Sequence, residues 1–95
     1  MDAKNIKTIS NVLKVLANDN RMMILCRLME KEQTVGDLQL ALSHISQAAI
    51  SQHLSVMKAN QLIDCQKHGM HSTYFISDKR LVQVFEVLKA NYCEI

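Results

Sequence analysis

The sequence predicts a mainly α-helical fold with one small β-hairpin, on three observations. Apolar side chains recur every three or four residues over most of the chain, which is the spacing of amphipathic helices. Aromatic residues make up only 4% of the 95 residues and proline is absent, so the core should consist of Leu, Ile, Val and Met. One stretch, residues 62–77, has a shorter and partly alternating period with a glycine near its middle, as a hairpin requires.

Two helices are expected in the first third of the chain. Residues 3–17 carry an apolar stripe at helical spacing. Its members are Ile6, Ile9, Val12, Leu13 and Leu16. The polar run 18–20 then breaks the chain and caps a second helix over residues 21–30, which is apolar at nearly every position. Its inward residues are expected to be Met22, Leu25, Leu28 and Met29.

The middle of the chain predicts two short helices joined by a turn. Thr34 occupies the N-cap of the first one, and Asp37 stands three residues later, where its carboxylate can bond the cap in return. A turn over 43–45 follows. Ser46 then caps a helix that extends to residue 60, with Ile50 and Leu54 on its buried stripe.

The last third predicts the hairpin and a final helix. The strands are expected at 62–66 and 72–77, and Asp78 caps the helix that follows them. The order of four helices, a hairpin and a helix is that of a winged helix-turn-helix, here as a single domain over residues 1–95 with an extra helix at each end. Both terminal helices are apolar on more sides than a small monomer can cover, which predicts a twofold homodimer built through them.

The exposed face of the helix that starts at Ser46 predicts binding to double-stranded DNA. It carries amides, hydroxyls and small side chains but no acidic group. Gln can bond an adenine edge, Ser can bond several base edges, and Ala can pack on a thymine methyl. The contact residues predicted in this helix are Ser46, Gln47, Ala48, Ser51, Gln52 and His53. His53 lies near the inner edge of the helix, where it either orients the helix or bonds a phosphate.

Cationic residues around this helix suit the DNA backbone. Lys58, at the far end of the helix, fits a phosphate better than a base. The hairpin tip carries Lys67, His68 and His71, which would reach the backbone or the adjacent minor groove. The alternative is a module for protein–protein contact, in which the polar face is only solvated and the hairpin docks on a partner.

Composition excludes several other classes. The net charge of +2 permits DNA binding without requiring it. No apolar run is long enough to cross a membrane, and residues 1–10 lack the apolar core of a signal peptide, so a cytoplasmic protein is expected. No catalytic triad or glycine-rich phosphate loop can be assembled, so we expect neither an enzyme nor a cofactor.

The histidines are candidate metal ligands, and the cysteines are candidate reactive thiols. The four histidines do not converge with carboxylates or thiols, so no metal site is predicted. Cys26 lies among apolar residues, where a small buried hydrophobe is the usual reading. Cys93 does not share the apolar stripe of its helix. Lys89, one turn earlier, favours its thiolate, whereas Glu94 and the negative end of the helix oppose it. We expect Cys65, on the first strand, to be incidental.

The sequence resembles the ArsR/SmtB family of bacterial repressors over residues 9–93. The motifs that carry the resemblance are LANDNRMMILC, SQAAISQHL and the terminal ANYC. Together they are similar to the branch that includes HlyU, BigR, YgaV and SqrR. In this branch, one cysteine in the second helix and one near the end of the last helix sense oxidants or reactive sulfur. The matching residues here are Cys26 and Cys93.

The resemblance implies a dimeric regulator whose DNA affinity is switched by oxidation, or by persulfide or polysulfide bridging, of Cys26 and Cys93. The family's metal ligands are missing. Thr34, Val35 and Gly36 stand where thiols would be, and Asp78 and Arg80 stand where an Asp-x-His pair would be. The turn ALSHISQ is one residue longer than the family pattern. The remaining alternative is a repressor of this fold with structural cysteines and a metal or small-molecule inducer.

Overall fold

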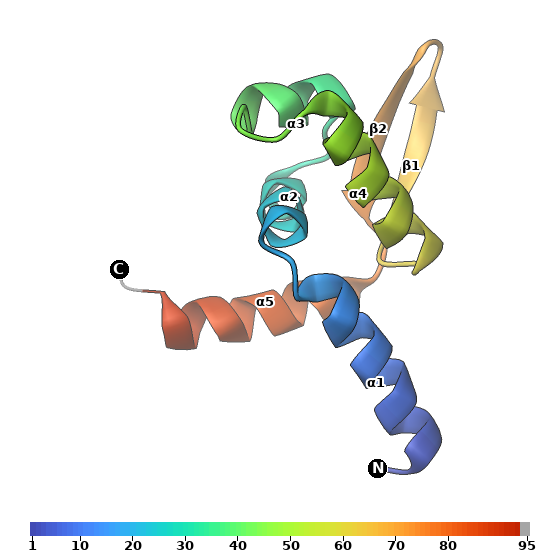
Figure 1. Cartoon of the computed structure of the whole chain (residues 1–95), viewed down its shortest axis with the longest axis vertical. Coiled ribbons are helices and arrows are strands. Elements are labelled where there is room, and N and C mark those ends of the chain that lie inside the picture. The colour runs from blue at the N-terminus through green and yellow to red at the C-terminus, as the bar shows by residue number, and fades with distance from the viewer. Residues whose placement is uncertain (94–95) are drawn as a thin grey trace.

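A computed structural model describes residues 1–93 and has the predicted order of elements. The helices and strands are α1 (Ala3–Leu16), α2 (Asp19–Glu30), α3 (Val35–Ala41), α4 (Gln47–Ala59), β1 (Ile63–His68), β2 (His71–Ile76) and α5 (Lys79–Tyr92). Figure 1 shows α2 in the middle, with α3, α4 and the hairpin together at one end. At the other end, α1 and α5 extend away in diverging directions.

Side-chain caps fix where the helices begin. Asp2, Asn18, Thr34, Ser46 and Asp78 each accept a hydrogen bond from a backbone N–H in the first turn of the helix that follows. At α3 the bond is reciprocal, because the Thr34 N–H also donates to Asp37 Oδ2 at 3.0 Å. The predicted caps at residues 34, 46 and 78 are confirmed.

The core lies between α2, α3, α4 and the base of the hairpin. Its most deeply buried side chains are Ile24, Leu25, Leu38, Ile50, Leu54, Met57, Leu62 and Ile63. Burying a side chain of this size stabilises a fold by about 1.5–3 kcal/mol relative to leaving it exposed. The predicted inner stripe of α4 is therefore confirmed, and it anchors this helix while leaving its opposite face free.

The first helix leaves apolar surface uncovered, as expected for a terminal helix, and one inward residue predicted for the second helix is wrong. In α1 the structure leaves Ile6 and Leu13 more than half exposed, at 54% and 56%, and buries Val15 and Leu16 at the end of the helix. The reason is that α1 extends away from the core and only its last turn reaches it (Figure 1). In α2, Met22 was expected inside but is exposed, because Ile24 fills the core in its place.

The hairpin is tighter than the sequence predicted. Its strands are antiparallel and reach to His68 and His71, which pair directly across from each other. Only Gly69 and Met70 form the turn. Gly69 has φ +62°, and Met70 is not among the described residues with positive φ. A glycine at the first position of a two-residue turn is the type II′ arrangement, which matches the twist of the strands.

The turn between α3 and α4 is held by its own hydrogen bonds. The side chain of Gln39 donates to the Ile45 carbonyl at 2.6 Å, and the Ile45 N–H donates to the Leu42 carbonyl at 3.0 Å. The side chains of Leu42 and Ile45 are both buried. The additional residue of this turn is therefore accommodated, and the direction in which α4 begins is defined.

Candidate nucleic-acid interface

The outer face of α4 has the composition that the sequence predicted. Gln47, Ala48, Ser51 and Gln52 are exposed, whereas Ile50 on the opposite side is completely buried. Figure 1 shows the hairpin beside this helix. The two elements together form one surface, with an uncharged helix face and a basic hairpin. A protein that binds DNA through a helix and a hairpin requires such a surface.

Two hydroxyls near this face are already engaged. Ser46 Oγ accepts from the Ala49 N–H at 3.1 Å, as an N-cap does. Ser55 Oγ donates to the Ser51 carbonyl at 3.0 Å. The Ser46 hydroxyl is therefore used to cap the helix. The exposed amides of Gln47 and Gln52 are more readily available to bond base edges.

His53 faces inward, toward α2. Its Nδ1 accepts from Arg21 Nε at 3.3 Å, and the side chain is half buried. Partial burial lowers the pKa of His53 below its ordinary value of 6.5, and the nearby Arg21 guanidinium lowers it further. Of the two roles expected for His53, this placement fits orientation of the helix.

The hairpin tip presents its predicted residues to solvent. Lys67, His68 and His71 are all exposed, and Lys67 pairs with Ser72 across the strands. Met70, at the turn, is 96% exposed, which makes it the most exposed of the large apolar side chains in the described part of the chain. The tip thus projects three potentially cationic side chains around a single thioether.

Lys58 lies at the junction of α4 and the hairpin. Its Nζ donates to Cys65 Sγ at 3.3 Å, which joins the last turn of the helix to β1. This hydrogen bond, together with the field of Cys65, raises the pKa of Lys58, which therefore remains cationic. Lys58 is exposed and stays within the same surface as the face of α4.

Cys26 and Cys93 are both exposed free thiols. The expectation that Cys26 is a buried hydrophobe is therefore wrong, because the core side of α2 is taken by Ile24 and Leu25. Partial covering of its sulfur raises the pKa of Cys26, and the charges of Cys93 and Glu30 raise it further, whereas Lys89 lowers it. Cys93 at the end of α5 thus lies within electrostatic reach of α2. Glu94 lies outside the described residues.

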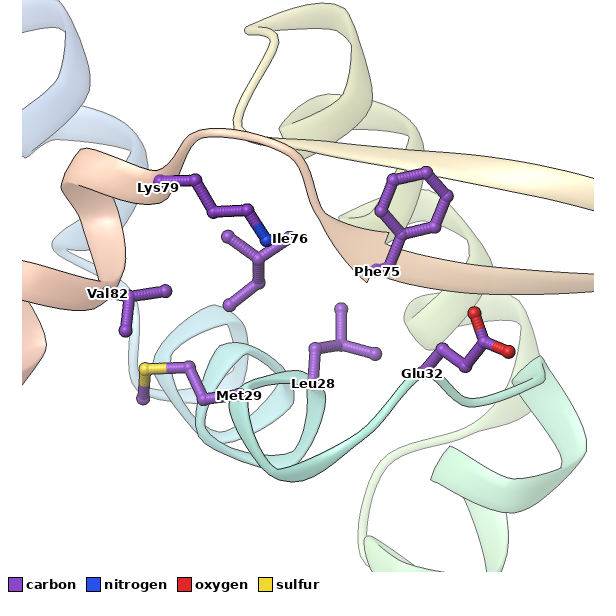
Figure 2. A pocket seen from close by; sticks show the side chains of 7 residues that line it. All are labelled: Leu28, Met29, Glu32, Phe75, Ile76, Lys79 and Val82. Carbon is purple, nitrogen blue, oxygen red and sulfur yellow. The ribbon is translucent and has the colours of Figure 1, made fainter.

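One groove next to the core is lined mainly by apolar side chains. It has a volume of about 310 Å³ and opens between α2, β2 and α5 (Figure 2). It is lined by Leu28, Met29, Glu32, Phe75, Ile76, Lys79 and Val82. None of these residues is a histidine, cysteine or serine. Within residues 1–93 no group of three or more His, Cys, Asp or Glu side chains could hold a metal ion, and no helix is long and apolar enough to cross a membrane.

Two residues that matter for this surface were missed by the sequence analysis. Arg21 was treated only as part of the second helix, yet it bonds His53. Gln33 stands in a polar run that resembles a solvated link, yet it is 2% exposed and bonds the hairpin backbone. The sequence around Arg21 and Gln33 does not indicate these contacts, because their partners His53 and Tyr74 are distant in sequence.

Comparisons with known proteins agree with this surface. The profile of a family described as "Bacterial regulatory protein, arsR family" matches residues 18–64. The transcriptional activator HlyU of Vibrio cholerae is 35% identical over 83 residues, which are 87% of this chain and 76% of that protein.

Two solved structures are also similar. The structure of HlyU from Vibrio cholerae has a TM-score of 0.89 at 33% identity, and the match covers 98% of this chain and 100% of that one. The homodimeric winged helix-turn-helix DNA-binding domain of Mb0332 from Mycobacterium bovis has a TM-score of 0.80 at 25% identity, with 97% and 87% covered.

Proposed function

The chain belongs to the arsR family of bacterial regulatory proteins, and from this premise we propose that it acts as a homodimer on a palindromic operator and changes its DNA affinity when Cys26 and Cys93 become bridged. Proteins of this family regulate transcription and are not enzymes. The observation that carries the DNA-binding part is the acid-free, exposed face of α4 beside a hairpin tipped with lysine and histidine.

The division of labour on DNA follows from the side chains. Gln52 and Gln47 offer both a donor and an acceptor, which is what bidentate contact to an adenine edge needs. Lys67, His68 and His71 on the hairpin, and Lys58 at the end of α4, would neutralise phosphates. α4 therefore reads bases in the major groove, and the hairpin sets the register on the backbone.

The exposed apolar face of the terminal helices supports the dimer. In α5, Val87 is 61% exposed and Tyr92 82% exposed, and in α1, Ile6, Ile9 and Leu13 are exposed as well. Exposed apolar surface of this kind usually marks an interface. The similar Mycobacterium bovis domain is homodimeric. Two copies of α4 related by a twofold axis would meet two half-sites about one helical turn of DNA apart.

The switch rests on the placement of the two thiols. Cys26 lies on α2 and Cys93 directly after α5, both are exposed, and the charge of Cys93 contributes to the raised pKa of Cys26. A bridge between them would tie the helix that packs on α4 to the helix that forms the dimer interface. Moving a two-state regulator from 1:99 to 99:1 needs about 5.5 kcal/mol of differential stabilisation, and a covalent link that fits only one arrangement can supply it.

The bridging chemistry balances with two classes of oxidant. A hydroperoxide oxidises one thiolate to a sulfenic acid and leaves as an alcohol or water. The second thiolate then attacks that sulfur, so the S–S bond forms and water leaves. With an organic trisulfide, each thiolate in turn attacks the central sulfur and displaces one thiolate of the donor. The central sulfur then remains as a bridge, and two thiols are released.

The first experiment measures DNA affinity before and after treatment with hydrogen peroxide or an organic trisulfide. The probe is a short duplex enriched from a random pool on the reduced wild-type protein. Wild type should change its affinity for this duplex, whereas Cys26→Ser and Cys93→Ser should not. Cys65→Ser is the matched control and should respond as wild type does, because Cys65 lies on β1 and takes no part in the proposed bridge.

The outcomes separate the parts of the proposal. If no duplex can be enriched, DNA binding itself is wrong. If Cys93→Ser responds as strongly as wild type, the bridge is wrong and a repressor with structural cysteines remains. Intact-mass measurement of the treated protein then distinguishes a disulfide, which loses two hydrogens, from a trisulfide, which retains one extra sulfur.

A further inference from the structure

The side chain of Arg21, in α2, makes polar contacts with both α1 and α4. Arg21 lies in the first turn of α2, where its N–H donates to the cap residue Asn18 at 3.1 Å. Its guanidinium donates from Nε to His53 Nδ1 at 3.3 Å and from Nη1 to the Val15 carbonyl at 3.1 Å. A single side chain thus reaches the end of α1 and the middle of α4.

The carbonyl at Val15 explains why a cation lies there. It belongs to the last turn of α1, where carbonyls have no partner within the helix. This end of a helix also carries partial negative charge, so a guanidinium is favourable in both respects. Arg21 therefore satisfies a carbonyl at the C-terminal end of α1 through Nη1, and at the same time donates from Nε to α4.

His53 is placed to fix the rotation of α4. It directly precedes the fully buried Leu54 and directly follows the exposed Gln52, so it stands on the border between the buried stripe and the outer face. A hydrogen bond at this border resists rotation of the helix about its axis. Even a small rotation would move Gln52 relative to a base edge.

We propose that Arg21 and His53 are a positioning pair that sets the orientation of α4 relative to the dimerisation helix α1, and so controls specific DNA affinity without either residue contacting a base. The inference rests on the proposed DNA-binding function. In this proposal, His53 bonds Arg21 within the protein and does not contact a base. The proposal also assigns to Arg21 a role that a surface arginine would not have.

The chemistry of the pair makes it sensitive to protonation. Nδ1 can accept from Arg21 only while the imidazole is neutral, with its proton on Nε2. Protonation would remove the acceptor and place a second cation beside the guanidinium. Arg21 is the charged group in the described part of the chain whose field acts on His53, and from the end of α1 the neighbouring group is the Val15 carbonyl. Burial and Arg21 both favour the neutral form.

The test compares variants that keep or remove the acceptor. In His53→Asn, the amide oxygen takes approximately the place of Nδ1, whereas His53→Leu has no acceptor. Arg21→Lys keeps the charge but has a single nitrogen in place of the planar guanidinium, whose Nε and Nη1 reach the two acceptors separately. With the enriched duplex, His53→Leu and Arg21→Lys should bind roughly tenfold more weakly, and His53→Asn close to wild type. Binding to a random-sequence duplex should change little in all three.

The pH dependence of DNA affinity distinguishes this positioning role from a merely structural one, which would leave it unchanged. Between about pH 7.5 and about pH 5.5, the ratio of wild-type to His53→Asn affinity for the enriched duplex should fall as His53 is protonated. His44, His68 and His71 are present in both proteins, so their contribution to DNA binding cancels in the ratio. This comparison also decides the matter if His53→Leu does not fold.

The outcomes keep the two proposals apart. If wild type enriches no duplex, the DNA-binding function fails. If wild type binds but Arg21→Lys and His53→Leu bind equally well, or the affinity ratio stays flat with pH, the positioning pair is wrong and DNA binding stands. Equal weakening on the enriched and the random duplex would also overturn it, because that pattern belongs to a phosphate contact.

Discussion

The backbones of Gln33 and Tyr74 exchange two hydrogen bonds, at 3.1 Å and 2.8 Å, so that the link between α2 and α3 forms a one-residue rung on the edge of β2. The side chain of Gln33 is buried and donates from Nε2 to the Arg27 carbonyl at 2.6 Å. The hairpin is therefore rooted in the same segment that leads into the helix-turn-helix. Movement of α2 would be transmitted to the hairpin as well as to α4.

Replacing Gln33 by Ala should lower the free energy of unfolding by about 1–3 kcal/mol, because the Arg27 carbonyl would lose its partner inside the protein. Urea unfolding followed by circular dichroism measures this change. Gln66→Ala is the matched control, since Gln66 is exposed on β1, and it should stay within about 0.5 kcal/mol of wild type. Equal effects of the two substitutions would show that the bond from Gln33 Nε2 to the Arg27 carbonyl does not stabilise the fold.

The end of α4 stores backbone strain at Gln61, whose φ is +63°. The Gln61 N–H donates to the Lys58 carbonyl, and the Leu62 N–H donates to the Met57 carbonyl. This is the Schellman arrangement, in which the left-handed residue is usually glycine. Gln61→Gly should therefore raise the free energy of unfolding by about 0.5–1 kcal/mol, with a corresponding rise in Tm.

The control for this prediction is the preceding residue. Asn60 has φ −90°, so glycine relieves no strain there, and Asn60→Gly also removes the bond from Nδ2 to the Val56 carbonyl. Asn60→Gly should lower the Tm. A rise of Tm in both variants would mean that the left-handed conformation at Gln61 is not the cause.

The order of elements was predictable because its signals are local. Each cap lies within three residues of the groups it bonds, as at Thr34 and Asp37, and the apolar stripe of α4 needs only its own helix to be recognised. The exposed face followed as the opposite side of that stripe. For the same reason the sequence alone assigns Gln47, Ala48 and Gln52 to it.

What could not be predicted depends on which distant group meets which side chain. Arg21 and His53 are 32 positions apart, and their contact follows from how α2 packs on α4. The stripe of α1 was recognisable from its spacing, but which of its residues remain uncovered was not: Leu13 is exposed, whereas Leu16 is buried. Periodicity identifies an apolar face without identifying the surface that it packs against.

The dimer interface can be tested with a charge on α1. Leu13→Glu places a carboxylate in the exposed apolar face, where a dimer would have to bury it without a partner. We expect this variant to sediment as a monomer and to lose affinity for the enriched duplex. Leu40→Glu is the control. Leu40 is 84% exposed on α3, away from the terminal helices, so this variant should remain dimeric. A dimeric Leu13→Glu variant would place the interface elsewhere.

The start of α3 should weaken in acid. Hydrogen bonds from the backbone and side chain of Thr34 lower the pKa of Asp37 below its ordinary value of 3.8. Since the pKa is lower in the folded state, the stabilisation is present above the unfolded pKa and is lost as the pH falls through the folded one. The stability advantage of wild type over Asp37→Asn should therefore shrink below about pH 4. A constant difference in urea midpoint across this range would show that the charge of Asp37 is not involved.

Substitutions of Gln52 and Lys67 should affect DNA binding in different ways if α4 contacts bases and the hairpin contacts phosphates. Gln52→Ala should reduce the discrimination between the enriched and the random duplex by about 1–3 kcal/mol, because a bidentate base contact is lost. Lys67→Ala should weaken both duplexes alike and make the slope of log affinity against log salt shallower by about 0.9, because one phosphate is no longer neutralised. Fluorescence anisotropy titrations at several salt concentrations measure both quantities. If Gln52→Ala changed the salt slope and left discrimination intact, α4 would lie along the backbone instead of in the major groove. The hairpin would then be the element to examine for base contact.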